Sequence, residues 1–139
     1  MAFFSPRDAG FWDMEPEFLQ SVQDACTPFG LKILHFVLGD KEDPSTPVAA
    51  MLEMPPGYVL PRHAHAVTRF EVIVKGSLTV GNRDYVAGDV MVSPPNEFYG
   101  PHIAGPDGCT TVEFFSSILG TGNTIYETAE GLERVSYRS

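Results

Sequence analysis

The stretch that decides the fold is residues 57–76, GYVLPRHAHAVTRFEVIVKG. It places His63 and His65 two residues apart, and in an extended backbone this spacing points both imidazoles to the same side. The chain has only four histidines, so this short segment holds half of them. Two neutral imidazoles on one strand form half of a site for a transition metal such as Fe, Zn, Mn, Ni or Cu.

Short apolar runs separated by glycine and proline flank this stretch on both sides, a pattern typical of an all-β domain. A sandwich or barrel is favoured, because a single sheet would leave one apolar face in water. One helix is predicted over Glu15–Asp24, and a loop over Asn96–Gly108. Strands are predicted at 31–38, 47–54, 69–75, 77–80, 84–86, 89–92 and 109–116, with weaker candidates at 123–127 and 132–137.

The stretch around the two histidines resembles the first cupin motif, G-x5-H-x-H-x3–4-E-x6-G, with Gly57, His63, His65 and Gly76 at the family spacing. Residues 88–99, GDVMVSPPNEFY, echo the second motif, G-x5-P-x-G-x2-H-x3-N, through Gly88 and Pro94. The resemblance covers residues 47–116. It implies a cupin-type double-stranded β-helix, that is, a jelly-roll barrel, over residues 29–139, with residues 1–28 as an N-terminal arm.

The sequence departs from the family pattern at two ligand positions. Arg69 occupies the position of the family's glutamate, and Glu71 follows two residues later. Tyr99 occupies the position of the second-motif histidine, and His102 follows three residues later. An intact cupin site would offer three histidines and one glutamate, so this chain keeps only His63 and His65 in register.

Three interpretations of the site follow from these departures. A β-bulge or a shifted loop could bring Glu71 or His102 in, so that a metal keeps three or four protein ligands. Alternatively, the two in-register histidines bind metal with one further protein ligand and leave positions open for water and substrate. In the third interpretation metal is absent, and Arg69, Tyr99 and the histidines form a polar pocket for an anionic ligand, which the guanidinium would bind bidentately.

Two patterns give opposite directions for the side chains of Arg69 and Glu71 on the predicted strand 69–75. Simple alternation sends Phe70, Val72 and Val74 to the core and the two charges to solvent. The cupin register instead points positions 69, 71 and 73 into the barrel. If Arg69 is buried, it must contact a ligand or pair with Glu71, because a buried unpaired charge is too costly.

Two further residues and three absent motifs bear on the candidate chemistry. His35 is expected to be a partly buried core residue, and Glu113 to face solvent. No Ser-His-Asp arrangement, phosphate-binding glycine loop or thiol nucleophile motif is evident in the sequence. The motif histidines are therefore the strongest candidates for function.

Charge and hydropathy exclude several classes of partner. The 139-residue chain has a formal net charge of −9, which disfavours nucleic acid and anionic membranes. No apolar run reaches the roughly 20 residues that span a bilayer, and the N-terminus carries acids where a signal peptide needs basic and apolar residues. We therefore expect a cytoplasmic protein with a small-molecule substrate or ligand. Because exposed edge strands are often covered by pairing, we also expect a homodimer.

The resemblance favours a metal-dependent enzyme that acts on a small oxygenated organic molecule, with dioxygenase as the preferred class. In that case His63 and His65 ligate a divalent transition metal, preferably Fe, with Zn, Mn or Ni as alternatives, and Glu71 or His102 is the third ligand. Arg69 would orient an acidic group, and Tyr99 would donate a hydrogen bond or proton. The alternatives are a non-catalytic cupin that binds or senses a small anion, and a cupin cyclase, lyase or isomerase.

Overall fold

The computed structural model describes residues 1–121 and 123–136. Within these residues the chain forms strands β1 (Lys32–Val37), β2 (Val48–Met54), β3 (Val59–Leu60), β4 (His63–His65), β5 (Arg69–Val80), β6 (Arg83–Val86), β7 (Val90–Ser93), β8 (His102–Phe115), β9 (Asn123–Thr128) and β10 (Gly131–Ser136). The helical segments are α1 (Gln20–Cys26), α2 (Ile118–Thr121) and the 3-10 turns η1 (Phe11–Asp13), η2 (Glu17–Leu19) and η3 (Thr27–Phe29).

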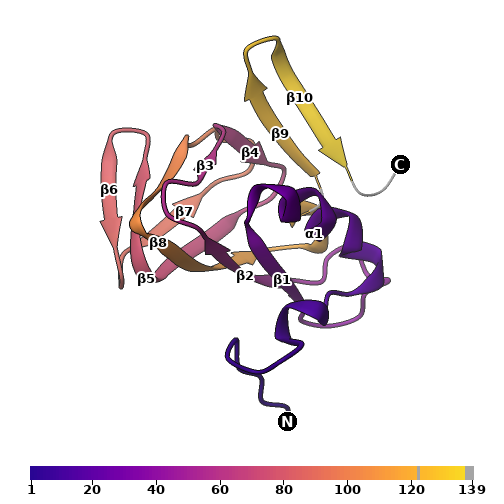
Figure 1. Cartoon of the computed structure of the whole chain (residues 1–139). Helices are drawn as coiled ribbons and strands as arrows, with labels where there is room; N and C mark the ends of the chain where they lie inside the picture. The colour runs from indigo at the N-terminus through magenta and orange to yellow at the C-terminus, as the bar shows by residue number, and fades with distance from the viewer. Residues whose placement is uncertain (122, 137–139) are drawn as a thin grey trace.

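All strand pairs are antiparallel and form two sheets (Figure 1). The larger sheet runs in the order β1-β2-β8-β5-β6, with β3 paired to β8 and β7 to β5. The smaller sheet has the order β10-β9-β4, so the strand that carries the two motif histidines lies beside the C-terminal hairpin. The predicted all-β class is confirmed.

The long strands β5 and β8 pair over most of their length and determine what faces inward. Burial alternates along β5, where Arg69, Glu71 and Ile73 are buried and Phe70 is exposed. The period of two is that of a strand with one face on the core. The cupin register is therefore the correct one, and the charged positions of this strand point into the barrel.

The predicted loop over Asn96–Gly108 is wrong in its second half, because β8 already begins at His102. The pairing with β5 jumps from Leu78↔Ala104 to Gly76↔Cys109, so residues 105–108 leave the ladder as a bulge within one strand. Gly76 permits this close crossing, since a Cβ there would lie 2.1 Å from the carbonyl oxygen of Gly108. Glycine and proline here mark an irregular strand rather than a loop.

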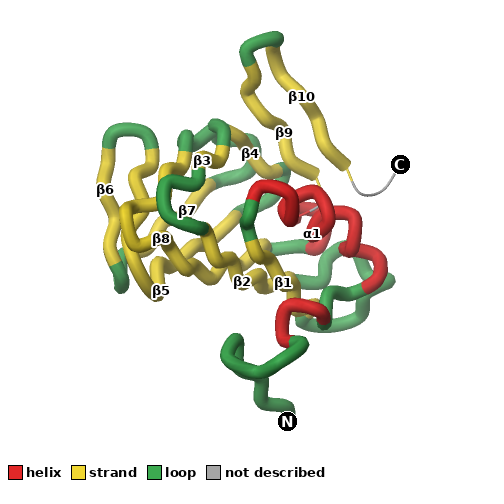
Figure 2. Tube along the Cα trace, in the orientation of Figure 1, coloured by secondary structure: helices red, strands yellow, loops and turns green. Residues whose placement is uncertain are grey.

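The N-terminal segment packs against the edge strand β1 through α1 (Figure 2). The rings of Phe4 and Phe11 also lie against the ring of Phe36 in β1. The predicted helix over Glu15–Asp24 begins too early, because α1 spans Gln20–Cys26 and follows the 3-10 turn η2. Glu15 lies outside both, where its carboxylate accepts the backbone N–H of His35 at 2.9 Å. Within the described residues no helix is long and apolar enough to span a membrane.

The barrel interior has an apolar part and a polar part. Among the described residues one hydrophobic cluster is formed by Leu31, Ile33, Ala50, Leu52, Met54, Ile73, Leu78, Ala104 and Cys109. Beside them lies a group of polar side chains, which we call the motif cluster: the buried His63, His65, Arg69, Glu71, His102 and Glu113, and the half-buried Tyr99. The cluster has to be explained by function, since burying so many polar groups stabilises no fold by itself.

Candidate functional site

His63 and His65 are held side by side on the short strand β4. Both residues are buried, and their ring centroids lie 5.2 Å apart. Pairing with β9 and an isolated bridge from His63 to Tyr99 fix the strand. The i, i+2 spacing thus correctly predicts two adjacent imidazoles inside the barrel.

A backbone carbonyl orients each of these two rings. The Nδ1 atom of His63 lies 2.7 Å from the carbonyl oxygen of Pro61, and that of His65 lies 2.8 Å from the carbonyl oxygen of Gly120. A carbonyl only accepts, so both Nδ1 atoms carry the proton and both Nε2 atoms carry the lone pair. Metal-ligating histidines commonly bind the ion with one ring nitrogen and donate the N–H of the other to a carbonyl oxygen in this way.

His102 joins the pair from the first position of β8. Its ring centroid lies 5.5 Å from that of His63, and the residue is 1% exposed. Both ring nitrogens are buried, and no described residue gives either one a hydrogen-bond partner. Burial, the neighbouring imidazoles and the charge of Arg69 lower the pKa of all three histidines to about 3. The three rings are therefore neutral at pH 7.

Arg69 is fully buried and is neutralised by two carboxylates. Its Nη1 lies 2.9 Å from Glu71 Oε1 and donates a hydrogen bond of 2.8 Å to Glu113 Oε2. Burial alone would disfavour the charge, but the two carboxylates outweigh it and raise the pKa of Arg69. The other oxygen of Glu71 accepts a hydrogen bond from Thr111 at 2.9 Å. The expected pairing of Arg69 with Glu71 is therefore present, and the Glu71 carboxylate is occupied by Arg69 and Thr111.

Glu113 contradicts the expectation of a solvent-facing carboxylate. It is 7% exposed, because β8 has the same inward alternation as β5 and Glu113 pairs opposite Glu71. Burial and the charge of Glu71 raise its pKa to about 7, against the opposing effect of Arg69. Sequence reasoning missed this residue, although its place two residues before the inward-facing Phe115 could have identified it.

Tyr99 lies between the cation and the imidazoles. Its ring centroid is 4.2 Å from the Arg69 guanidinium carbon and 4.6 Å from the His63 ring. Its hydroxyl is buried, and burial raises the pKa of Tyr99 well above its ordinary value, so the group keeps its proton. Neither this hydroxyl nor Arg69 Nε and Nη2 has a hydrogen-bond partner among the described residues. The cluster therefore presents several unused donors.

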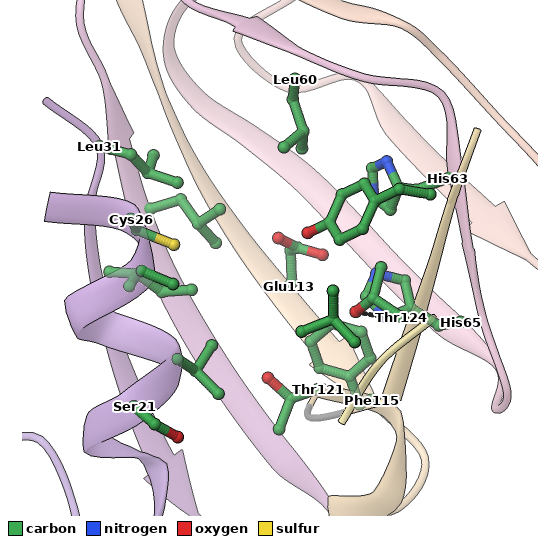
Figure 3. A pocket seen from close by; sticks show the side chains of 16 residues that line it. Ser21, Cys26, Leu31, Leu60, His63, His65, Glu113, Phe115, Thr121 and Thr124 are labelled. Atoms are coloured by element: carbon green, nitrogen blue, oxygen red, sulfur yellow. Dashed lines mark hydrogen bonds between the residues drawn. The ribbon is translucent and has the colours of Figure 1, made fainter. Parts of the chain in front are cut away.

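A pocket of about 220 Å³ opens beside the cluster (Figure 3). His63, His65 and Glu113 line it, together with Thr121, Thr124 and Tyr126. Helix α1, the β9–β10 hairpin and the strands β1, β2, β3 and β8 contribute most of the remaining wall, which is largely apolar. The volume and lining suit a small organic molecule with a few polar groups.

The histidines fit a transition metal in donor type and protonation. His63 and His65 each offer an oriented Nε2, and His102 offers two buried nitrogens without partners. In residues 1–121 and 123–136, no three His, Cys, Asp or Glu side chains already stand in an arrangement that could hold the ion. The fit is therefore one of donor chemistry and not of a completed coordination shell.

His35 lies outside the motif cluster. It is 2% exposed rather than partly buried, and it contacts Glu15 on one side and Thr121 on the other. Twenty and 86 residues separate these partners along the chain, so no local pattern could have indicated the contact.

No protein-family model and no curated protein matches the sequence. Solved structures do match its fold. An acetylacetone dioxygenase from Acinetobacter johnsonii is 16% identical with a TM-score of 0.59, over 78% of this chain and 72% of that one. A cupin-like protein from Thermotoga maritima is 19% identical with a TM-score of 0.58, over 72% and 80%.

A third match comes from the Rhodobacter sphaeroides complex of SigE with the anti-sigma ChrR, at 17% identity and a TM-score of 0.53. It covers 63% of this chain but only 44% of the matched chain, so the likeness concerns one part of that protein. Most of the other matches are described as cupin or cupin-like proteins. With two motif histidines inside an antiparallel barrel, this chain has the fold of a small cupin domain.

Proposed function

We propose that the chain is a metal-dependent cupin enzyme that acts on a small oxygenated organic molecule, with dioxygenase as the favoured reaction. The observation that carries the proposal is the group of three buried, neutral imidazoles beside a small apolar pocket. Buried polar atoms normally have partners, yet both ring nitrogens of His102 lack one among the described residues. A ligand at this position would account for them.

The proposed metal ligands are His63, His65 and His102. A divalent ion, with Fe preferred and Zn, Mn or Ni as alternatives, would supply a Lewis acid and, as iron, the one-electron chemistry that dioxygen requires. Glu71 is the alternative third ligand, but its carboxylate already contacts Arg69 and Thr111. Three protein ligands would leave positions open for the substrate.

The chain's own side chains provide the acid–base and orienting functions. Glu113 lines the pocket, and its pKa of about 7 lets its carboxylate take up a proton from the substrate and return it near neutral pH. Arg69 orients that carboxylate through Nη1. Arg69 and Tyr99 line a second hollow of about 150 Å³ rather than the 220 Å³ pocket, and Nε and Nη2 of Arg69 would bind an acidic or enolate oxygen there. Tyr99 is the matching hydroxyl donor. The apolar wall excludes water from the bound molecule.

One observation favours the alternative of a metal-free cupin that binds a small anion. The guanidinium of Arg69 stands where the family has a glutamate ligand, and its charge contributes to the lowered pKa of all three histidines. A fixed cation at that position repels a dication. Metal content therefore decides between the two candidates.

The test is elemental analysis of protein purified from metal-supplemented medium, for wild type and the variants His63→Ala, His102→Ala and Glu71→Gln. We expect a stoichiometric metal in wild type and in Glu71→Gln, and its loss in both histidine variants. His35→Gln is the matched control, because it removes the histidine outside the cluster. Less than about a tenth of an equivalent in wild type would instead support the metal-free pocket.

Oxygen uptake tests the reaction class on the same proteins. Acetylacetone is the probe, because a structural neighbour is an acetylacetone dioxygenase. Substrate-dependent uptake by the iron-loaded wild type, absent in His63→Ala, supports a dioxygenase. Metal binding without uptake from acetylacetone or other small β-diketones would reject it in favour of a cyclase, lyase or isomerase.

A further inference from the structure

A second set of buried polar side chains lies outside the motif cluster and reaches the same pocket. We call Glu15, His35 and Thr121 the relay. Glu15 contacts His35 Nδ1, and His35 Nε2 lies 2.6 Å from Thr121 Oγ1. The side chains of Glu15 and His35 are completely buried, and Thr121 is the member that lines the pocket. A carboxylate, an imidazole and a hydroxyl thus stand in the order of an activated nucleophile.

The direction of the protons in the relay follows from its partners. The carboxylate of Glu15 accepts at both oxygens, one from the backbone N–H of His35 at 2.9 Å and one from Nδ1. Because Nδ1 then carries the ring proton, Nε2 has the lone pair and accepts from the Thr121 hydroxyl. The hydroxyl proton points at His35, and the lone pairs of Oγ1 remain for the pocket. This is the polarity that general-base activation requires.

The relay is anchored on three different segments. Glu15 comes from the N-terminal segment, His35 from the middle of β1, and Thr121 from the end of α2. A Cβ on the neighbouring Gly120 would lie 2.0 Å from Val67 Cγ2, so the backbone of α2 packs closely at this point, and the contact with His35 Nε2 holds the Thr121 hydroxyl in place. Figure 3 shows Thr121 in the wall of the pocket together with Phe115 and Glu113. A fixed hydroxyl beside an apolar space can meet a bound acyl group.

We propose that Thr121 is a nucleophile that accepts an acyl group from small, largely apolar esters bound in this pocket. His35 is its general base, and Glu15 is the positioning residue that orients the imidazole. This activity is separate from the metal chemistry proposed above and uses the other histidine of the chain.

The reaction balances without any further reactant except water. Thr121 Oγ1 adds to the ester carbonyl carbon while His35 Nε2 takes the hydroxyl proton. The bond from carbon to the leaving oxygen breaks, and the leaving alcohol receives that proton, so the acyl group remains as an ester of Thr121. Water then attacks the acyl carbon with His35 as the base, the bond to Oγ1 breaks, Oγ1 regains a proton, and a carboxylic acid is released.

The test uses p-nitrophenyl acetate and the full chain after treatment with a chelator, so that hydrolysis by a bound metal is excluded. We expect a stoichiometric burst of p-nitrophenolate, and an acetyl group located on Thr121 by peptide mass spectrometry after acid quenching. Thr121→Val should lose both, Thr121→Ser should keep both, and His35→Gln should slow the burst by roughly 100-fold or more. Thr46→Val is the matched control, since Thr46 is a buried threonine outside the pocket and should leave the burst unchanged.

The proposal is overturned by the absence of a burst, by a burst that persists in Thr121→Val, or by an acetyl group found on another residue. Circular dichroism and thermal unfolding of each variant separate loss of chemistry from loss of the fold. Metal content, measured in parallel, is expected to be unchanged in Thr121→Val. Failure of this proposal is thereby distinguishable from failure of the metal site.

Discussion

The motif cluster and the relay are two buried polar groups on one pocket, and they differ in how the chain brings them together. His63 and His65 are two residues apart on one strand, whereas Glu15, His35 and Thr121 come from three segments. The cluster also leaves ring nitrogens, a hydroxyl and guanidinium N–H groups without partners among the described residues, while each relay contact is satisfied. Buried groups without protein partners are the ones that a bound ligand would satisfy. The relay instead has the order of carboxylate, imidazole and hydroxyl on which an activated nucleophile depends.

The largest expected effect is acid unfolding driven by the cluster. The native pKa values of His63, His65 and His102 are lowered to about 3 from an ordinary 6.5, so the unfolded chain binds more protons. Their contribution to stability is present above pH 6.5 and is lost as pH falls toward 3. Glu113, with its pKa raised to about 7, opposes this trend below pH 7 because its native state binds the extra proton.

Urea unfolding of chelator-treated protein between pH 7 and pH 4 measures this dependence. Each histidine contributes a slope of about 1.4 kcal/mol per pH unit in its titration range. His102→Phe should remove one such contribution and flatten the curve. An identical slope in wild type and His102→Phe would mean that His102 is not buried in its neutral form.

The second effect concerns the ion pairs of the cluster. Arg69→Met keeps an unbranched apolar stem but leaves Glu71 and Glu113 buried without their cation, which should cost about 3–5 kcal/mol of unfolding free energy. The triple variant Arg69→Met, Glu71→Gln, Glu113→Gln should recover much of this loss, because no buried charge remains. Denaturant titration of the wild type and both variants measures these unfolding free energies. A decrease of less than about 0.5 kcal/mol in Arg69→Met would indicate that Arg69 lies at the surface.

A contact can be predicted from the sequence when its two residues lie close together along the chain, and the motif cluster and the relay differ in this respect. The two histidines, the inward direction of Arg69 and most strands follow from spacings of a few residues. Glu113 pairs with Arg69 across 44 residues, and Thr121 meets His35 across 86, so only tertiary structure can bring these groups together. The strand from His102 was missed because the bulge at residues 105–108 contains Gly and Pro, which are also the residues of loops.

A smaller effect is expected at the residue that joins the two regions. The carbonyl oxygen of Gly120 accepts the Nδ1 proton of His65, and the next residue is the relay's Thr121. Gly120→Ala introduces a Cβ against Val67 and Phe115, and overpacking of this kind costs roughly 1–3 kcal/mol. The variant should weaken metal retention and the acylation burst together. Loss of only one of them would show that the two regions are independent.

An effect of similar size on stability is expected from the far end of the relay. Glu15→Gln keeps one acceptor oxygen for the backbone N–H of His35 but removes the charge that faces Nδ1, at a cost of about 1–3 kcal/mol. The burst rate should fall more than the stability does, because the ring loses its orientation. An unchanged rate, compared with the conservative Glu15→Asp, would leave Glu15 as a purely structural residue.

Anomalous diffraction from crystals of the iron-loaded protein, recorded at the iron edge, tests the central claim most directly. The account predicts one strong peak at bonding distance from Nε2 of His63, Nε2 of His65 and a ring nitrogen of His102, with Glu71 still paired to Arg69. A peak bonded to Glu71 in place of His102 would contradict the assignment of the third ligand. A cluster without any peak would contradict the metal site itself.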